Sequence, residues 1–216
     1  MNKIKACIFD LDGVIVDTAK YHYLAWKRLA EELGFEFTEE QNERLKGVSR
    51  MKSLEILLEI GNRKFDEEEK LKLADKKNNW YKEYISTMKE DEILPGTKEF
   101  LENVRASGIK TALGSVSKNS MTILNNLKLI KYFDAVIDGN KVSNAKPDPE
   151  VFLLGASEVN IDPKNCVVFE DAQAGIEAAI NAGMYSIGIG DPHILNRANF
   201  VINSLKEMTM EKLNLL

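Results

Sequence analysis

The chain has 216 residues, of which 44% are hydrophobic and 29% are charged, a composition typical of a soluble globular protein. Its formal net charge is -5 at pH 7, and without a basic excess we expect neither nucleic acid nor a membrane surface as a partner. The first apolar run ends at Asp10, which is too short for a signal peptide, and no run approaches membrane-spanning length.

The first predicted element is a buried strand over the apolar run from Ile4 to Phe9, which leads into Asp10-Leu11-Asp12-Gly13. Residues i and i+2 of an extended chain point to the same side, so the carboxylates of Asp10 and Asp12 can face one substrate. Gly13 then allows the backbone to turn away sharply. Taken alone, the pattern is equally compatible with an ordinary turn, because Asp and Gly are common in turns.

The stretch from residue 16 to residue 94 has a helical pattern throughout and is predicted to be an all-helical insert. Capping residues and glycines mark its divisions. Four helices are expected: from near Thr18 to Leu33 with Gly34 as its stop, from a capping box of Thr38 and Gln41 to Gly47, from Ser49 to Gly61, and from Asp66 with Glu69 onward.

From Pro95 onward the pattern alternates between strand and helix. Five further strands are predicted, at residues 109–114, 135–137, 166–169, 186–189 and 200–202. Such alternation implies an α/β fold, a parallel sheet with helices on both faces. Residues 1–15 and 95–216 are therefore predicted to form one α/β core domain, and residues 16–94 a helical domain inserted next to Asp10.

Polar residues stand at the predicted strand ends. Asp10 and Asp12 follow the first strand, and further groups follow the next three: Ser115, Val116, Ser117, Lys118 and Asn119, then Lys146 with Pro147, then Glu170 with Asp171. In open α/β sheets, ligands bind at the carboxyl ends of the strands. Carboxylates, hydroxyls and an ammonium group at one edge suit a phosphate group and a hard cation such as Mg²⁺.

Each of these groups also has a purely structural interpretation. Ser115 and Ser117 alone are typical helix caps, and Lys146 alone is typical of a solvated surface charge. Glu170 and Asp171 could be an acidic pair at a helix N-terminus, where the helix dipole favours negative charge. Their joint appearance behind consecutive strands of one sheet favours a functional site.

These residues carry a resemblance to the haloacid dehalogenase superfamily. Asp10-Leu11-Asp12-Gly13-Val14 resembles its first motif, Ser115 the second, Lys146-Pro147 the third, and Glu170-Asp171 with Ala174-Gly175-Ile176 the fourth. The resemblance spans the whole predicted core and implies a Rossmann-like parallel sheet with an inserted all-helical cap.

The resemblance also implies roles. Asp10 would be the nucleophile that becomes an aspartyl phosphate, and Asp12 the general acid and base. Asp10, the backbone carbonyl of Asp12 and Asp171 would hold Mg²⁺, with Glu170 at or next to the metal. Ser115 and Lys146 would bind the transferring phosphoryl group, in line with phosphoryl transfer as positioning plus charge neutralisation.

Within the superfamily, the insert is similar to the cap of the β-phosphoglucomutase family. The similar pieces are Thr18 with His22-Tyr23-Leu24-Ala25-Trp26, then Lys46-Gly47-Val48-Ser49-Arg50, then Lys76-Lys77-Asn78. Residues 115–119 resemble that family's phosphate loop, although Gly114 and Val116 replace expected alanines. The implied substrate contacts are Thr18, His22, Trp26, Lys46, Gly47, Arg50, Ser53 and Lys77 in the cap, and Ser115, Val116, Ser117, Lys118, Asn119 and Lys146 in the core. The resemblance further suggests that His22 couples cap closure to the position of Asp12.

The turn between Lys46 and Arg50 has its own physical interpretation. Gly47 ends one predicted helix and Ser49 starts the next, so exposed amides and the Arg50 guanidinium can form an anion site. An ordinary helix–helix turn is the alternative. A second anion site is what a bisphosphate intermediate requires, and a simple phosphatase does not need one.

The function implied by the resemblance is the interconversion of β-D-glucose 1-phosphate and D-glucose 6-phosphate. The reaction would use Mg²⁺ and pass through β-glucose 1,6-bisphosphate. A sugar-phosphate phosphatase with the same core is the alternative. A non-catalytic binding protein is disfavoured because Asp10, Asp12, Lys146 and Asp171 are all present.

The two cysteines, Cys7 and Cys166, each lie in an apolar run and are expected to be buried free thiols. Without a disulfide framework we expect a cytoplasmic protein. A monomer that takes a small sugar phosphate is expected.

Overall fold

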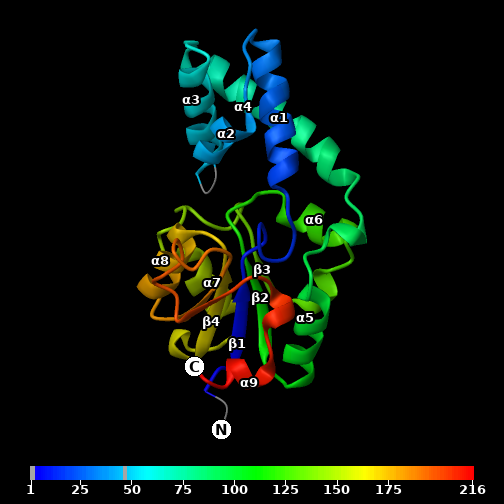
Figure 1. Ribbon diagram of the computed structural model, residues 1–216, viewed down its shortest axis with the longest axis vertical. Coiled ribbons are helices and arrows are strands. Elements are labelled where there is room, and N and C mark those ends of the chain that lie inside the picture. The colour runs from blue at the N-terminus through cyan, green and yellow to red at the C-terminus, as the bar shows by residue number, and fades with distance from the viewer. Residues whose placement is uncertain (1–2, 46–47) are drawn as a thin grey trace. The chain divides into compact units, whose positions relative to one another are not determined.

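The computed structural model describes residues 3–45 and 48–216. The chain divides into two compact units, one made of Met1–Asp17 with Met88–Leu216 and the other of Thr18–Thr87 (Figure 1). The first is an α/β unit and the second is all-helical.

The α/β unit contains a six-stranded sheet in the order β3-β2-β1-β4-β5-β6. All its strand pairs are parallel, and Ala6 in the central strand lies between Lys110 of β2 and Cys166 of β4. The strands are β1 (Ala6–Phe9), β2 (Lys110–Gly114), β3 (Ala135–Ile137), β4 (Cys166–Glu170), β5 (Tyr185–Ile189) and β6 (Phe200–Ile202). The predicted parallel α/β sheet is confirmed.

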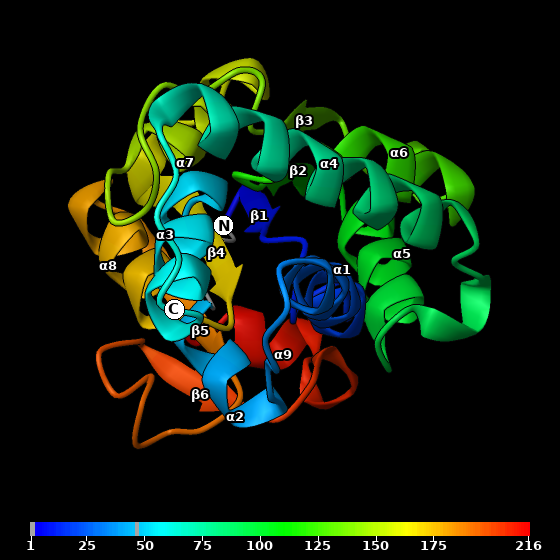
Figure 2. The ribbon, with the colours of Figure 1, turned by 90° about the horizontal axis from the view of Figure 1, so that it is seen from above.

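Helices cover both faces of this sheet, with α5 on one side and α7 and α8 on the other (Figure 2). Alternate residues of β1 serve the two faces. Ile8 packs into an apolar cluster with Phe152 of α7, whereas the ring of Phe9 stacks on Phe169 and meets Phe100 of α5 edge-on. The helices of this unit are α5 (Thr97–Ala106), α6 (Ser120–Asn126), α7 (Glu150–Glu158), α8 (Gln173–Asn181) and α9 (Met210–Leu213).

Short 3₁₀ turns complete the α/β unit. They are η2 (Glu90–Glu92), η3 (Ile130–Tyr132), η4 (Pro163–Asn165) and η5 (Leu205–Glu207).

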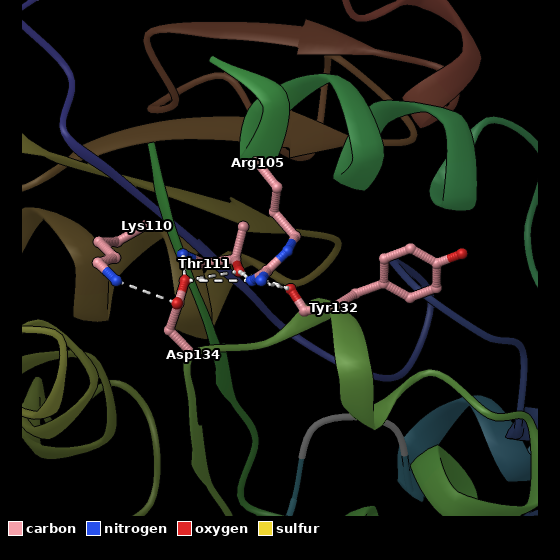
Figure 3. A network of polar contacts seen from close by, with 5 residues as sticks. All are labelled: Arg105, Lys110, Thr111, Tyr132 and Asp134. Carbon is pink, nitrogen blue, oxygen red and sulfur yellow. Dashed lines mark hydrogen bonds and ion pairs between the residues drawn. The ribbon is translucent and has the colours of Figure 1, made fainter. Parts of the chain in front are cut away.

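A polar network ties the amino-terminal ends of β2 and β3 to α5 and η3 (Figure 3). The Asp134 carboxylate accepts hydrogen bonds from the Thr111 backbone N–H at 2.9 Å and from Arg105 at 3.3 Å. Its other oxygen accepts from the Lys110 ammonium at 3.1 Å. The Thr111 hydroxyl and Arg105 also donate to the Tyr132 carbonyl, at 2.6 and 3.2 Å. One carboxylate and one carbonyl thus satisfy donors from α5 and β2.

The helical unit consists of α1 (Ala19–Glu32), α2 (Glu39–Asn42), η1 (Glu43–Leu45), α3 (Arg50–Ile60) and α4 (Glu67–Ser86). The predicted capping boxes are confirmed, because Thr38 pairs reciprocally with Gln41 and Asp66 with Glu69. The Ser49 hydroxyl caps α3 by accepting from the Lys52 N–H. The helix that starts at Thr38 is shorter than predicted, since one α-turn passes into a 3₁₀ turn at Glu43. Its predicted end, Gly47, lies outside the described residues.

The boundaries of the two units differ from those expected from sequence. Residues 16–17 and 88–94 belong to the α/β unit rather than to the insert. Backbone pairing explains the difference, because Val16 bridges to Ile93 and the Leu94 N–H donates to the Ile15 carbonyl at 3.0 Å. The assignment of the two units as catalytic core and cap stays a prediction.

The two cysteines are both free and buried, as predicted. Burial raises the pKa of Cys7 well above its ordinary range and that of Cys166 to about 12, so neither thiol is reactive near neutral pH. Among the described residues, we find no helix that combines the length and the apolar character needed to span a membrane.

Candidate active site

Three carboxylates meet where the two central strands end. Asp10 follows β1, Glu170 closes β4, and Asp171 comes next; one oxygen of each lies within 4.8 Å of the others. The Asp10 N–H donates to the Phe169 carbonyl at 3.0 Å, which continues the sheet pairing up to the site. The gathering follows from topology, because parallel neighbouring strands end at the same edge.

Lys146 supplies the positive charge in this cluster. Its ammonium group forms an ion pair with the Asp10 carboxylate and lies 3.4 Å from a carboxylate oxygen of Glu170. All three side chains are at most 10% exposed. The Lys146 ammonium also lies 4.8 Å from the centre of the Phe152 ring. The Lys146 ammonium therefore lies over the ring of Phe152, a residue of α7.

The charges in the cluster do not balance. Burial alone would lower the pKa of Lys146, but the charges of Asp10 and Glu170 outweigh it and hold that pKa above its usual value. Burial raises the pKa of Glu170 well above the ordinary range, with Asp10 and Asp171 adding to the effect against the opposing charge of Lys146. One ammonium group thus faces three carboxylates, and the surplus negative charge suits a cation.

Asp171 is exposed as a residue, but its carboxyl group lies against the loop after β1. Partial desolvation together with the charges of Asp10 and Asp12 raises its pKa to about 7. A Cβ atom on Gly13 would lie 2.0 Å from an Asp171 oxygen, and Gly13 has φ +74°. Gly13 is thus required both for its backbone conformation and for the space that Asp171 occupies.

Asp12 is half-buried, two residues beyond Asp10, and its charge acts on Asp171. Its backbone forms a bridge with Val16 in the loop that leaves the sheet. Asp12 therefore belongs to the same electrostatic cluster as the three carboxylates. Oxygen donors of this kind and number fit a hard divalent cation.

The loop after β2 runs from Ser115 to Asn119. Since β2 is the sheet neighbour of β1, this loop follows the strand next to the one that ends at Asp10. Ser115 is buried, and its hydroxyl accepts from the Ser117 N–H at 3.1 Å. The Ser117 hydroxyl in turn accepts from the Asn119 N–H at 3.3 Å. Val116 and Lys118 are exposed. The two serine hydroxyls thus make hydrogen bonds within the loop. The Asn119 side chain does not cap α6.

The helical unit has a second group of the predicted site residues. Lys77 on α4 is only 2% exposed, and its ammonium lies 2.9 Å from Nδ1 of His22 on α1. The same ammonium is 4.4 Å from the centre of the Trp26 ring and 5.0 Å from that of Tyr81. The rings of His22 and Tyr81 stack with centroids 4.1 Å apart. The buried ammonium group of Lys77 therefore lies against aromatic rings.

Basic groups surround Lys77 and His22. Burial lowers the pKa of Lys77 well below its ordinary value, and the charge of Arg50 adds to the effect. Burial and the charges of Lys77 and Arg50 likewise lower the pKa of His22, so the imidazole is neutral at pH 7. Half-buried Arg50 has Asp75 at 3.9 Å as its acidic neighbour, while Asp75 itself is largely exposed. Such a cluster is suited to an anion.

The remaining predicted residues fall into place as follows. Thr18 and Ser53 are buried, and the Thr18 carbonyl accepts from the His22 N–H at 3.1 Å. Lys46 and Gly47 lie outside the described residues. Sequence reasoning did not assign Tyr81 and Phe152 to the site. Tyr81 lies four residues after Lys77, and this helical spacing could have revealed it. Phe152 has no such signal, because only the fold brings it under Lys146.

Comparison with known proteins matches residues 7–189 to the family of haloacid dehalogenase-like hydrolases. The chain belongs to this family. It is 41% identical to β-phosphoglucomutase of Bacillus subtilis (strain 168), over 98% of this chain and 94% of that protein. It is 38% identical to a phosphorylated carbohydrates phosphatase of Thermotoga maritima, over 89% of this chain and 88% of that protein.

A solved structure gives the same result. The crystal structure of β-phosphoglucomutase from Clostridium difficile superposes with a TM-score of 0.90 at 46% identity, covering 97% of this chain and 95% of that one. The likeness includes the helical unit as well as the sheet. The predicted fold, an α/β parallel-sheet core of the haloacid dehalogenase type with a helical insert, is confirmed.

Proposed function

We propose that this chain is a β-phosphoglucomutase, which interconverts β-D-glucose 1-phosphate and D-glucose 6-phosphate through β-glucose 1,6-bisphosphate. The observation that carries the proposal is the extent of the likeness. Identity of 41% to one β-phosphoglucomutase covers 98% of the chain, and 46% identity to another covers 97%. The likeness thus includes both the sheet with its four motifs and the helical unit, which in this fold is expected to choose the substrate.

In the proposed reaction, Asp10 transfers the phosphoryl group in both directions. Phosphorylated Asp10 gives its phosphoryl group to the 6-hydroxyl of β-glucose 1-phosphate, and Asp12 takes the proton from that hydroxyl. The bisphosphate then turns around. An Asp10 oxygen bonds to the phosphorus at C1 as the bond to the C1 oxygen breaks, and Asp12 returns the proton to that oxygen. Glucose 6-phosphate leaves, and Asp10 is again phosphorylated.

The proposal assigns Lys146 and Ser115 to the transferring phosphoryl group. In the resting protein, Lys146 pairs with Asp10 and Glu170, so a cationic donor already lies beside the nucleophile. Positive charge held in place before reaction needs no reorganisation as negative charge develops. The neighbouring residues Val116, Ser117, Lys118 and Asn119 complete the proposed phosphate loop.

Magnesium is the proposed cofactor. Asp10, Asp171 and the Asp12 carbonyl would hold it, with Glu170 at or next to the metal. The fit is supported by three carboxylate oxygens within 4.8 Å of one another and by the raised pKa values of Glu170 and Asp171. When bound, Mg²⁺ would supply positive charge that neutralises the phosphoryl oxygens.

In the helical unit, Arg50 with Lys46 and Gly47 is proposed to bind the phosphate that is not being transferred. Thr18, His22, Trp26, Ser53 and Lys77 are proposed to contact the sugar phosphate. The electropositive surroundings of Lys77 and Arg50 support an anionic ligand here.

The test is to supply β-glucose 1-phosphate with Mg²⁺ and a trace of the bisphosphate, and to measure both products. Glucose 6-phosphate without stoichiometric inorganic phosphate is the expected result. Free phosphate with glucose would instead support a sugar-phosphate phosphatase, an alternative motivated by the relative from Thermotoga maritima. No turnover of any phosphomonoester would favour a non-catalytic binding protein.

The oligomeric state and cellular location of the protein are also part of the proposal. A cytoplasmic monomer is in keeping with two free, buried thiols and with a carboxylate cluster built from a single chain. Sedimentation or gel filtration of the purified protein tests the monomer.

A further inference from the structure

The segment after β3 forms hydrogen bonds with the backbone of the proposed phosphate loop, residues 115–119. β3 lies next to β2, and Ile137 pairs with Gly114 at the end of both strands. Beyond the strands the contact continues, because the Ser115 N–H donates to the Ile137 carbonyl at 3.0 Å. The Gly139 N–H then donates to the Ser117 carbonyl at 3.1 Å. Residues 138–140 therefore follow the loop backbone residue by residue.

Asn140 makes the most elaborate contact of this segment. Its side-chain amide nitrogen donates to the Lys118 carbonyl at 3.2 Å and to the Asp138 carboxylate at 3.0 Å. Its backbone N–H donates to the other Asp138 oxygen at 3.0 Å. Both neighbours of the side-chain amide are acceptors, so its NH₂ group and not its oxygen must face them. Asp138, only 6% exposed, thus fixes Asn140 in the orientation that reaches Lys118.

Gly139, between these two residues, brings the backbones into direct contact. A Cβ atom there would lie 2.1 Å from the Val116 carbonyl oxygen and 3.0 Å from the Lys118 nitrogen. Backbone atoms cannot move aside as the end of a flexible side chain can. The small residue lets Asp138 and Asn140 hold the loop at its closest approach.

The consequence concerns peptide orientation. In a planar trans peptide the C=O and N–H groups point in opposite directions. When the carbonyls of Ser117 and Lys118 are held against residues 139–140, their oxygens point toward that segment. The N–H groups of the same two peptides, those of Lys118 and Asn119, point the other way, and that of Asn119 donates to the Ser117 hydroxyl at 3.3 Å. A loop that receives an anion needs this polarity, because exposed carbonyl oxygens would repel phosphate.

We propose that Asn140, held by Asp138, is a positioning residue that keeps the Lys118 carbonyl turned away from the phosphate site. It acts through the loop backbone and not through contact with substrate. The inference rests on the proposed function only in taking residues 115–119 as a phosphate loop.

The experiment measures binding of inorganic phosphate to the resting protein by calorimetry in the presence of Mg²⁺, alongside mutase turnover. Asn140→Ala leaves the Lys118 carbonyl without its donor and is expected to weaken phosphate binding about tenfold, an effect in the range of one lost hydrogen bond. KM for the sugar phosphate should rise by a similar factor, and Mg²⁺ affinity should not change. Asn140→Asp keeps the shape but replaces a donor by an acceptor, so its loss of phosphate affinity should exceed that of Asn140→Ala.

Asn165→Ala is the matched control. Its side-chain amide also donates to a backbone carbonyl, that of Lys3 at 2.9 Å, but just before β4 begins, at the opposite edge of the sheet. This variant should bind phosphate like the wild type.

Two results would overturn the inference. One is wild-type phosphate affinity in Asn140→Ala; the other is an Asn140→Asp variant that binds phosphate better than Asn140→Ala, which would mean that the side chain only fills space. Both results are measured on the variants and say nothing about the mutase activity of the wild-type protein. Failure of the proposed function would instead appear in the wild-type protein, as glucose and free phosphate or no turnover.

Discussion

Two charged clusters lie at opposite ends of the same sheet and are organised in opposite ways. At the amino-terminal ends of β2 and β3, the single carboxylate of Asp134 receives Arg105, Lys110 and the Thr111 N–H. At the carboxyl ends of β1 and β4, three carboxylates gather, and the Lys146 ammonium forms ion pairs with two of them, Asp10 and Glu170. The first cluster is satisfied within the protein, whereas the second leaves negative charge that an added cation can neutralise.

The pKa values record this difference. Burial by itself would raise the pKa of Asp134, but the Thr111 N–H and the Lys110 ammonium lower it overall. The pKa of Glu170 and that of Asp171 are both raised. A lowered carboxyl pKa means that the ionised group stabilises the fold, and a raised one means that it opposes the fold. The ionised carboxylate at one end of the sheet therefore stabilises the fold, whereas those of Glu170 and Asp171 at the other end oppose it.

The largest effect is expected at the nucleophile. Asp10→Asn should abolish turnover, because an amide cannot form the acyl phosphate and is a poorer metal ligand. The assay is mutase turnover with a mass measurement that verifies the substitution. Asp162→Asn is the control, since Asp162 is also paired with a lysine but lies on an exposed turn before β4. Wild-type-like activity in verified Asp10→Asn protein would remove Asp10 from its assigned role.

The neighbouring aspartate should behave differently. Asp12→Ala is expected to lower turnover by roughly 10²–10⁴, the usual contribution of a general acid and base. Its proposed metal contact is the backbone carbonyl, so Mg²⁺ affinity should stay close to that of the wild type. Calorimetric titration of Mg²⁺ beside the kinetic assay separates the two roles. If metal binding is lost while turnover is kept, the roles given to Asp12 are reversed.

The helical unit has a third charged group, which contains Arg50 and Lys77 and is the proposed second anion site. Arg50→Ala should lower mutase kcat/KM by roughly ten- to thousandfold, because each lost charge-assisted hydrogen bond is worth about 1.5–3 kcal/mol. Hydrolysis of a small acyl phosphate engages only the carboxylate cluster and should change little. Arg44→Ala, which removes an exposed ion pair with Glu59 in the same unit, is the control. An equal fall in both activities would make Arg50 structural.

The carboxylate cluster should make metal binding depend on pH. The pKa of Asp171 is raised from 3.8 to about 7 without metal, so the folded state disfavours its ionised form. Metal-free protein should therefore lose stability as the pH rises from about 4 to about 7 and then level off. Protons compete with Mg²⁺ for the same oxygens, so the gain in Tm from Mg²⁺ should grow between about pH 5 and 8. A gain that does not change with pH would contradict the electrostatic account, and Asp171→Asn should reduce the dependence, leaving the part that comes from Glu170.

The smallest effect is expected at the satisfied cluster. Asp134→Ala should lower the free energy of unfolding by about 1–3 kcal/mol at pH 7, because its donors lose their acceptor. Since its pKa is lowered, this contribution should disappear as the pH falls below about 4. Chemical denaturation at both pH values is the measurement, and mutase activity should be unchanged. Glu158→Ala, which removes a half-exposed partner of Lys141, should cost less than about 1 kcal/mol.

Local sequence patterns predicted much of the fold because the relevant signals are local. Capping at Thr38 and Asp66, and the strand runs that end at Asp10 and Glu170, depend on neighbours in sequence. The parallel arrangement then brings the strand ends together without any need to know the strand order.

What the sequence did not reveal depends on residues far apart in the chain. Two contacts arise only when distant segments pack. They are the contact of the Phe152 ring with the Lys146 ammonium and the hydrogen bond from Asn140 to the Lys118 carbonyl. The unit boundaries shifted for the same reason, since Val16 pairs with Ile93 across the whole insert. Periodicity gives no information about such pairs. Which of the predicted site residues touch substrate stays a prediction.

The strand order has a consequence for biosynthesis. β1 lies in the middle of the sheet, between β2 and β4, although it is translated before the other five strands of this sheet. Its pairing with β4 must wait until residues 166–170 have emerged. The helical unit, by contrast, is one continuous stretch, Thr18–Thr87, and depends on no later segment for its own contacts. The order in which this chain is translated is therefore not the order in which its sheet can close around Asp10.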